Sequence, residues 1–311
     1  MNTIKQLLRD RNSILTMALA LGLVWGDGAQ KTEQLMLPAL ALVMTIAVMG
    51  ITGNVFRSFK LFAVHGITGI FMSYAIHGVF LIGLSWLFIH DVSLRNGFII
   101  LAAVPPAVAV IPFSVFLKGD DTVSLLGTIG AYLGAFVITP LIALIFFGSG
   151  FISPVKLLTL ILELIILPVI LSRFLIWTRL ARTLEPVKGI LTNWSFFLVT
   201  YTIVGLNQQV FLSQPLSILP VAFVAAAGFF LLGWLIERAG VILGFEKNVV
   251  VSLVLLGTLK NYGLSGGLAL SFFDQKTAIP SSVSVVLMVI YIIWLEYRKK
   301  RYEKNLQALR Q

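Results

Sequence analysis

Apolar stretches of about 20 residues recur along the whole 311-residue chain, and they constrain its fold more than any other feature. A stretch of that length crosses the hydrocarbon core of a bilayer, about 30 Å thick, as an α-helix. The chain is 58% hydrophobic and 12% charged, whereas soluble domains contain about 25% charged residues. The alternating pattern of a membrane β-barrel is absent from the sequence. The sequence therefore predicts an all-α membrane protein.

Ten membrane-spanning helices are expected. Their approximate ranges are 12–27, 35–53, 61–88, 96–117, 122–148, 156–177, 188–207, 216–237, 248–272 and 279–297. An even number of spans places both termini on one side of the membrane. Because both ends are rich in lysine and arginine, the positive-inside rule predicts that both termini are cytoplasmic, in a multi-pass protein of the cell membrane (plasma or inner membrane). The first eleven residues are polar, so no cleavable signal peptide is expected.

The positions of the 23 lysines and arginines fit this topology. The predicted cytoplasmic ends and loops hold 18 of them, and the predicted outer loops hold four, Lys31, Arg95, Lys156 and Lys276. The net charge of +10 is therefore explained by membrane topology, with anionic lipid as a partner and no nucleic acid expected. The remaining basic residue, Lys260, falls inside a predicted span.

Two predicted spans contain helix-breaking residues near their middle. The fourth span reads LAAVPPAVAVIPFSV, and its Pro105, Pro106 and Pro112 each remove an amide donor and clash with the preceding turn. The ninth span reads LLGTLKNYGLSGG at residues 255–267, where the glycines and Asn261 favour unwinding. Non-helical backbone at this depth survives only where it is buried in protein or lines a cavity. Both spans are therefore expected to be discontinuous helices.

The two interruptions are about 155 residues apart, which is roughly half of the chain, and the two spans run in opposite directions. This is the pattern of a transporter built from an inverted repeat, whose discontinuous helices meet near the bilayer midplane around the binding site. We therefore expect five plus five helices, in repeats of residues 1–150 and 151–311, with a basic cytoplasmic tail after the tenth helix.

Residues 105–142 read PPAVAVIPFSVFLKGDDTVSLLGTIGAYLGAFVITPLI. This segment resembles the broken fourth helix and the fifth helix of the bile acid:sodium symporter family. The positions that match the family's motifs along the chain are Gly119-Asp120 in the turn before helix five, Ser124 at its start, Thr139-Pro140 near its end, Asn261 and Gly263 in helix nine, and residues 35–50 in helix two. The resemblance implies a panel domain of helices 1, 2, 6 and 7, a core domain of helices 3–5 and 8–10, and organic acids as the substrate class.

The chain departs from the family at the sodium sites. The family residues that supply oxygen ligands to two sodium ions fall here on Val110, Ile111, Ala131, Tyr132, Leu256 and Lys260. A hard cation needs several oxygen ligands, and the side chains of valine, isoleucine, alanine and leucine offer none. The resemblance therefore implies the family's fold and cavity for this chain but not its sodium sites, and sodium coupling is not expected.

Lys260 replaces one of those ligands and brings its own positive charge. We expect its ammonium to hold the two broken helices together, with its three donors accepted by carbonyl oxygens at the ends of the half-helices. A charge at the bilayer centre costs roughly 2.5–3.5 kcal/mol. Glu163, the one acid of 13 inside a span, is the candidate partner, because at about 1.5 Å per residue the two lie at nearly the same depth. Three roles remain open for Lys260: a permanent structural cation, a proton-loaded coupling group, or a direct ligand of an anionic substrate.

Other candidate site residues surround the two interruptions. Asn261 is the best polar neighbour for a substrate or for Lys260, and Tyr132 is expected to fill the space of a lost ion site. The remaining candidates are Thr258 and Tyr262 beside the ninth-span break, Ser114 and Thr128 near the fourth-span break, Asn193 in the seventh span, and His77 in the third span, which is expected to be packed rather than to relay protons.

These observations predict a secondary active transporter that moves a small organic anion by alternating access, without sodium, and with protons as the coupling ion if Lys260 titrates. The alternatives are a sodium-coupled symporter with atypical sites and a sensor that kept the fold but does not transport. No enzymatic activity is expected, because His77 is the only histidine within a span and no carboxylate is near it in the sequence. A nucleotide-binding loop and cysteines are both absent, so neither ATP drive nor a cofactor or metal site is expected. The sequence names neither the substrate nor the oligomeric state.

Overall fold

The computed structural model describes residues 10–49, 58–107, 109–148, 162–206, 208–213 and 218–308, and its elements there are helices. Five helical stretches are long and apolar enough to cross a membrane: Phe59–Phe88, Asp121–Phe147, Lys188–Leu206, Leu219–Ile242 and Gln275–Arg301. The shorter apolar helices are Ser13–Val24, Val92–Ala103, Leu167–Trp177 and Lys247–Thr258. The predicted all-α class is confirmed, and the long apolar helices indicate a multi-pass membrane protein.

The helices follow one another along the chain with short connections. In the first half they are α2 (Arg11–Val24), α3 (Asp27–Thr32), η1 (Glu33–Leu35), α4 (Met36–Met49), α5 (Phe59–Ile70), η3 (Phe71–Gly78), α6 (Val79–Phe88), α7 (Val92–Ala103), α8 (Val110–Leu117) and α9 (Asp121–Phe147). In the second half they are η4 (Leu162–Ile166), α11 (Leu167–Trp177), α12 (Leu180–Leu184), α13 (Lys188–Leu206), α14 (Gln208–Ser213), α15 (Leu219–Ala226), η5 (Ala227–Leu231), α16 (Leu232–Ile242), α17 (Lys247–Thr258), α18 (Tyr262–Phe272) and α19 (Gln275–Ala308). Of these, η3, η4 and η5 are π-helical, and η3 and η5 join the helices on either side of them into single long helices.

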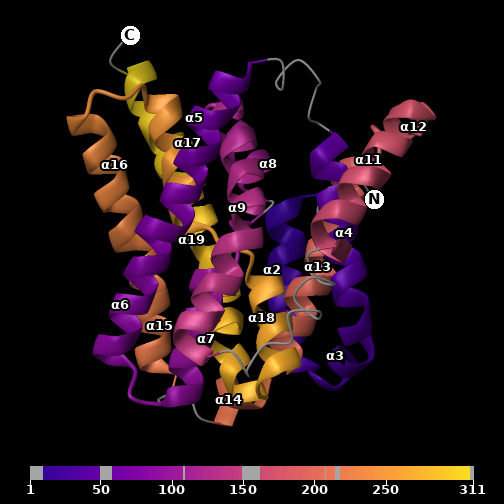
Figure 1. The fold of residues 1–311 in the computed structure, drawn as a ribbon, viewed down its shortest axis with the longest axis vertical. Helices are drawn as coiled ribbons and strands as arrows, with labels where there is room; N and C mark the ends of the chain where they lie inside the picture. The colour runs from indigo at the N-terminus through magenta and orange to yellow at the C-terminus, as the bar shows by residue number, and fades with distance from the viewer. Residues whose placement is uncertain are drawn as a thin grey trace.

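Both interruptions predicted from the sequence are present. The fourth span divides into α7 and α8 around Pro105 and Pro106, and the ninth divides into α17 and α18 around Lys260. Figure 1 shows α7 and α18 in the lower half of the molecule and α8 and α17 in the upper half, so the two breaks lie between these halves. Pro140 and Pro280, in contrast, lie inside the continuous helices α9 and α19.

Two helix boundaries differ from the prediction. Helix α7 begins at Val92 rather than at 96, because Asp91 caps it and accepts a hydrogen bond from the Leu94 amide at 3.1 Å. Arg95, predicted in an outer loop, is therefore part of the first turn of α7. Helix α19 runs to Ala308 rather than ending at 297, because the basic tail is rich in strong helix formers.

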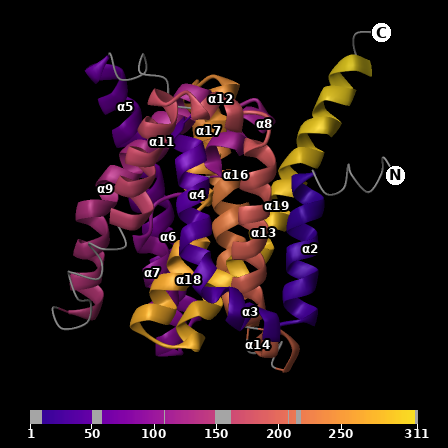
Figure 2. The same ribbon diagram turned by 90° about the vertical axis from the view of Figure 1, so that its right-hand side faces the viewer.

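The end of α19 lies at the top of Figure 2, and α2 begins in the upper half of the same view. The turns that join α6 to α7 and α18 to α19 lie at the opposite side.

Helices α5 and α9 approach each other through glycines. A Cβ atom added at Gly69 would lie 1.9 Å from the carbonyl oxygen of Gly127, and one added at Gly130 would lie 2.2 Å from the Cα of Gly66. The obstructing atoms belong to the backbone, which cannot move aside by changing a side-chain rotamer. The crossing therefore requires small residues, as close helix contacts in membranes generally do.

We predict that Gly69→Ala lowers the unfolding temperature in detergent by several degrees, because overpacking of this kind costs about 1–3 kcal/mol. The matched control is Gly83→Ala in α6, where an added Cβ has no other atom within 4 Å. Thermal unfolding of both variants checks the prediction. A Gly69→Ala protein as stable as the Gly83→Ala protein would show that the α5–α9 contact is looser than described.

Candidate functional site

The two interrupted helices cross and pair with each other through their non-helical backbone. Pro106 and Lys260 form an antiparallel bridge. The amide of Ala107 donates to the carbonyl of Leu259 at 3.2 Å, and the amide of Asn261 donates to the carbonyl of Pro105 at 3.0 Å. Backbone groups released by one break are thus satisfied by the other, as buried backbone without water requires.

The ammonium of Lys260 lies at this crossing and is fully buried. Its Nζ donates to the carbonyl oxygens of Ala102 and Val104, both at 2.9 Å, and to the hydroxyl oxygen of Ser73 at 3.0 Å. These three bonds use all three donors of an ammonium. The nitrogen also lies 4.5 Å from the centre of the Tyr74 ring, a cation–π distance.

The acceptors of Lys260 come from the end of a half-helix. Ala102 belongs to the last turn of α7, and Val104 follows its final residue. The carbonyl between them, that of Ala103, accepts a hydrogen bond from the Thr139 hydroxyl at 2.7 Å. Carbonyls at a helix C-terminus carry partial negative charge and favour a cation. Two of the three donors are thus accepted by half-helix carbonyls, as expected, whereas the third is accepted by the Ser73 hydroxyl and not by a carbonyl.

Glu163 is not the partner of Lys260. Its side chain is exposed on η4, which packs against α4. The contacts of the Lys260 ammonium are two carbonyls, one hydroxyl and one ring, so the pairing expected from the matching depths is wrong. Depth alone did not specify on which side of its helix each residue lies.

Asn261 and Tyr132 lie together beside the crossing. The Asn261 side chain caps α18 by accepting from the Leu264 amide at 3.0 Å, and its Nδ2 donates to the Tyr132 hydroxyl at 3.1 Å. Tyr132 is buried and packs with Val43 and Met44 of α4. Val110, Ala131 and Leu256, three of the apolar positions singled out in the sequence analysis, are each fully buried.

The hydroxyls of Thr258 and Tyr262 donate hydrogen bonds to backbone carbonyls near the end of α17. The Thr258 hydroxyl donates to the Val254 carbonyl at 2.7 Å, and the Tyr262 hydroxyl donates to the Thr258 carbonyl at 3.1 Å. Both side chains are buried. They lie at the crossing as expected, and these two hydrogen bonds are those of local backbone capping.

Ser114 lies away from the crossing, near the other end of α8. Its hydroxyl oxygen is 3.1 Å from that of Ser252 and accepts from Ser124 at 2.7 Å. The Ser252 hydroxyl also accepts from the Asp120 amide at 2.8 Å. This buried cluster joins the Gly119-Asp120 turn to α17, so Ser114 belongs to a structural joint rather than to the crossing.

His77 and Thr128 each place a buried polar atom that has no hydrogen-bond partner among the described residues: Nδ1 of His77 and Oγ1 of Thr128. His77 is on η3, one turn from Ser73, and Thr128 is on α9, one turn from Tyr132. Asn193 is half-buried on α13, a helix that packs against α18 but is not itself interrupted.

Sequence reasoning missed Ser73, Tyr74 and Thr139 as parts of the site. Ser73 and Tyr74 lie in FMSYAIHG, the most polar stretch of the third span, and this local polarity is the signal that could have indicated them. Thr139 was noted only as a family match. The carbonyls of Ala102 and Val104 leave no side-chain signal, since alanine and valine are ordinary residues of an apolar helix.

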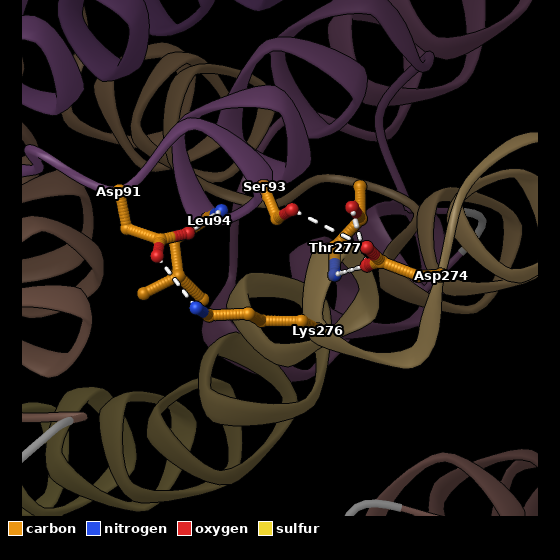
Figure 3. A network of polar contacts seen from close by, with 6 residues as sticks. All are labelled: Asp91, Ser93, Leu94, Asp274, Lys276 and Thr277. Carbon is orange, nitrogen blue, oxygen red and sulfur yellow. Dashed lines mark hydrogen bonds and ion pairs between the residues drawn. The ribbon is translucent and has the colours of Figure 1, made fainter.

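A polar network joins the start of α7 to the start of α19, as Figure 3 shows, and is called the outer network after its predicted side of the membrane. Lys276 pairs with Asp91 at 2.5 Å, which links the start of α19 to the start of α7. Asp274 caps α19 by accepting from the Thr277 amide at 2.7 Å and accepts from the Ser93 hydroxyl of α7 at 3.3 Å. The hydrogen bond from Lys276 lowers the pKa of Asp91. Partial burial acts to raise the pKa of Asp274, but the hydrogen bonds from Thr277 and Ser93 lower it overall.

The chain was compared with known proteins. No protein-family model matches it, and no curated protein matches it.

We predict that the outer network stabilises the protein at neutral pH and is lost in acid. Both carboxyls have a folded-state pKa below the usual value, so their contribution is present above that value and disappears as the pH falls through the folded pKa. Asp91→Asn should therefore lower the unfolding temperature at pH 7 by a few degrees at most, since exposed pairs contribute about 0.2–1 kcal/mol. The difference from wild type should shrink progressively as the pH falls below the usual aspartate pKa of about 3.9.

Thermal unfolding of wild type and Asp91→Asn across this pH range checks the prediction, with Glu33→Gln, an exposed acid of η1, as control. A gap between wild type and Asp91→Asn that stays constant down to pH 3 would contradict it.

Proposed function

We propose that the protein is a secondary transporter of a small organic anion, with ten membrane-spanning segments in a five-plus-five inverted repeat and both termini in the cytoplasm. The observation that carries the proposal is the crossing of two interrupted helices with a buried lysine between them. Discontinuous helices that meet in this way form the substrate and ion sites of many transporters. The motif resemblance to the bile acid:sodium symporter family supports the same fold and an organic acid as substrate.

The positions of the helices support the repeat. Lys260 lies 154 residues after Pro106, its partner in the bridge. The same shift carries Phe88, the end of α6, onto Ile242, the end of α16, and carries Asp120, the cap of α9, onto Asp274, the cap of α19. It also places η5 within the range of η3. One shift thus relates the third to fifth spans to the eighth to tenth.

The contacts between helices support the division into panel and core domains. Helices α4 and α13 of the proposed panel pack on α18 of the proposed core, and α13 and α2 also pack on α19. A Cβ atom added at Gly263 of α18 would meet Val199 and Leu40, and one added at Gly267 would meet Met36. These contacts lie on the lower half of the molecule in Figure 1, the proposed outer side. In alternating access, the core would leave the panel along this face of α18.

The geometry favours Lys260 as a resident structural cation among its three possible roles. Its three donors are already accepted by oxygens of the chain, which leaves none for a substrate carboxylate in this conformation. Two of the acceptors are carbonyls at the end of a half-helix, the kind of group that coordinates sodium in transporters with broken helices. Lys260 therefore occupies a cation position permanently, and the neighbouring apolar residues Val110, Ala131 and Leu256 leave a second position without side-chain oxygens.

Transport assays in proteoliposomes test this function. A panel of labelled organic anions, from pyruvate to taurocholate, should include one with saturable uptake that does not change when sodium is replaced by choline. Lys260→Gln should reduce that uptake at least tenfold (about 1.4 kcal/mol or more), whereas Lys31→Gln, at an exposed lysine of α3, should not.

Uptake that depends on a sodium gradient would favour a sodium-coupled symporter with atypical sites. Tight binding of an anion without flux would favour a sensor. An uptake rate that rises with a proton gradient in wild type but not in Lys260→Gln would assign the proton-loaded role to Lys260.

A further inference from the structure

We infer that Lys260 is a fixed positive charge that moves with the core domain, so that the empty core carries a charge of +1 and the core loaded with one monovalent organic anion is neutral. The inference rests on the proposed function and adds to it the charge of the substrate and the mode of transport. Three observations support it. The groups that contact Lys260 all come from the proposed core, these groups carry no charge, and the corresponding half-helix end in the second repeat is occupied by a neutral group.

The lysine and its acceptors belong to one moving unit. Ser73 and Tyr74 are on η3, and Ala102 and Val104 are at the end of α7. With Lys260 itself between α17 and α18, these contacts come from the third, fourth and ninth spans, all of the proposed core. The ammonium therefore keeps its coordination when the core moves against the panel.

The acceptors solvate the charge without cancelling it. Two are carbonyl oxygens, one is a hydroxyl and one is an aromatic ring, and each is formally neutral. The acids of the described core helices lie away from the crossing. Five of them are at helix starts, Asp91, Asp120, Asp121, Glu246 and Asp274, and three lie near the basic end of the chain, Glu237, Glu296 and Glu303. Glu237 pairs with Arg298, and Glu296 pairs with Lys300. The middle of the described core thus carries the single formal charge of Lys260.

The related position in the second half is filled by a neutral group. The shift of 154 residues carries the Val104 carbonyl, which accepts from Lys260, onto the Thr258 carbonyl at the end of α17. That carbonyl accepts from the hydroxyl of Tyr262 at 3.1 Å. Each half-helix end at the crossing is therefore occupied by a side chain of the protein, one charged and one neutral.

A covalently attached cation changes the transport cycle. A bound sodium ion is released on one side, and the empty carrier returns without it, whereas Lys260 must return with the core. An intramembrane charge that moves through the field responds to the membrane potential. A monovalent anion in the site neutralises the moving core, so the loaded core crosses more easily than the empty one, and the transporter favours exchange of monovalent organic anions over net uptake.

The natural absence of cysteine permits a test that needs no substrate. A single cysteine at Gly267, on the face of α18 that meets Met36, reports when the core leaves the panel on the outer side; the added Cβ lies 3.2 Å from the flexible end of Met36. The Gly267→Cys protein is reconstituted in one orientation in proteoliposomes without organic anions. Labelling by an impermeant maleimide from outside is then timed under potassium diffusion potentials of equal size and opposite sign.

An inside-negative potential should draw the charged core inward and slow labelling, and an inside-positive potential should speed it. The ratio of rates should be about twofold or more, since a full charge crossing the whole field gives a far larger ratio. Adding Lys260→Gln to Gly267→Cys should remove the dependence on sign, Lys260→Arg should retain it, and Lys31→Gln, at an exposed lysine of α3, should leave it unchanged.

Labelling that ignores the sign of the potential in the Gly267→Cys protein would overturn the inference, whatever the stability of the Lys260 variants. The same holds if Lys260→Gln folds and keeps the full dependence. A cysteine that is never labelled, or is always labelled as fast as in unfolded protein, would instead show that the outer contact does not alternate, and this would overturn the proposed function as well.

Discussion

The hydrogen bonds between the Lys260 ammonium and the end of α7 are the interaction on which the rest of the structure depends. Two helices are broken in the middle of an apolar protein, and each break releases backbone groups that lipid cannot satisfy. The bridge between Pro106 and Lys260 satisfies the amides, and the ammonium and the Thr139 hydroxyl satisfy the last carbonyls of α7. Removing the ammonium would leave buried acceptors unpaired at the point where both helices are weakest.

The surrounding structure holds the two breaks in position against each other. At the cytoplasmic side as proposed, the serine cluster around Ser252 fixes the turn between α8 and α9 to α17. At the opposite side, Asp91 and Lys276 fix the start of α7 to α19. The glycine contact of α5 with α9 brings the third span close to the fifth. Rigid ends and a close-packed neighbour are what allow a central charge to keep three bonds at 2.9–3.0 Å.

The helices, both interruptions and the unusual lysine could be predicted from the sequence, because apolar length, proline and an intramembrane charge each act locally. The partner of the lysine could not. Glu163 was chosen because it was the other charge at the right depth, whereas the real acceptors are main-chain oxygens of Ala102 and Val104, which no residue type reveals. Ser114 was placed near the site because it follows the fourth-span break, but the direction of its side chain depends on how α8 packs on α9. The repeat, the transport activity and the roles of Asn193, His77 and Thr128 stay predictions.

The central claim, that Lys260 stands in place of a bound cation, is tested most directly by the unfolding temperature of the purified protein in sodium and in choline at equal ionic strength. Wild type should unfold at the same temperature in both salts, because the cation position is already filled. Lys260→Gln should be less stable and should gain a rise in sodium, since a ligand that binds the folded state raises its stability. A sodium-specific rise of several degrees in wild type, or a Lys260→Gln protein that does not respond to sodium, would contradict the claim.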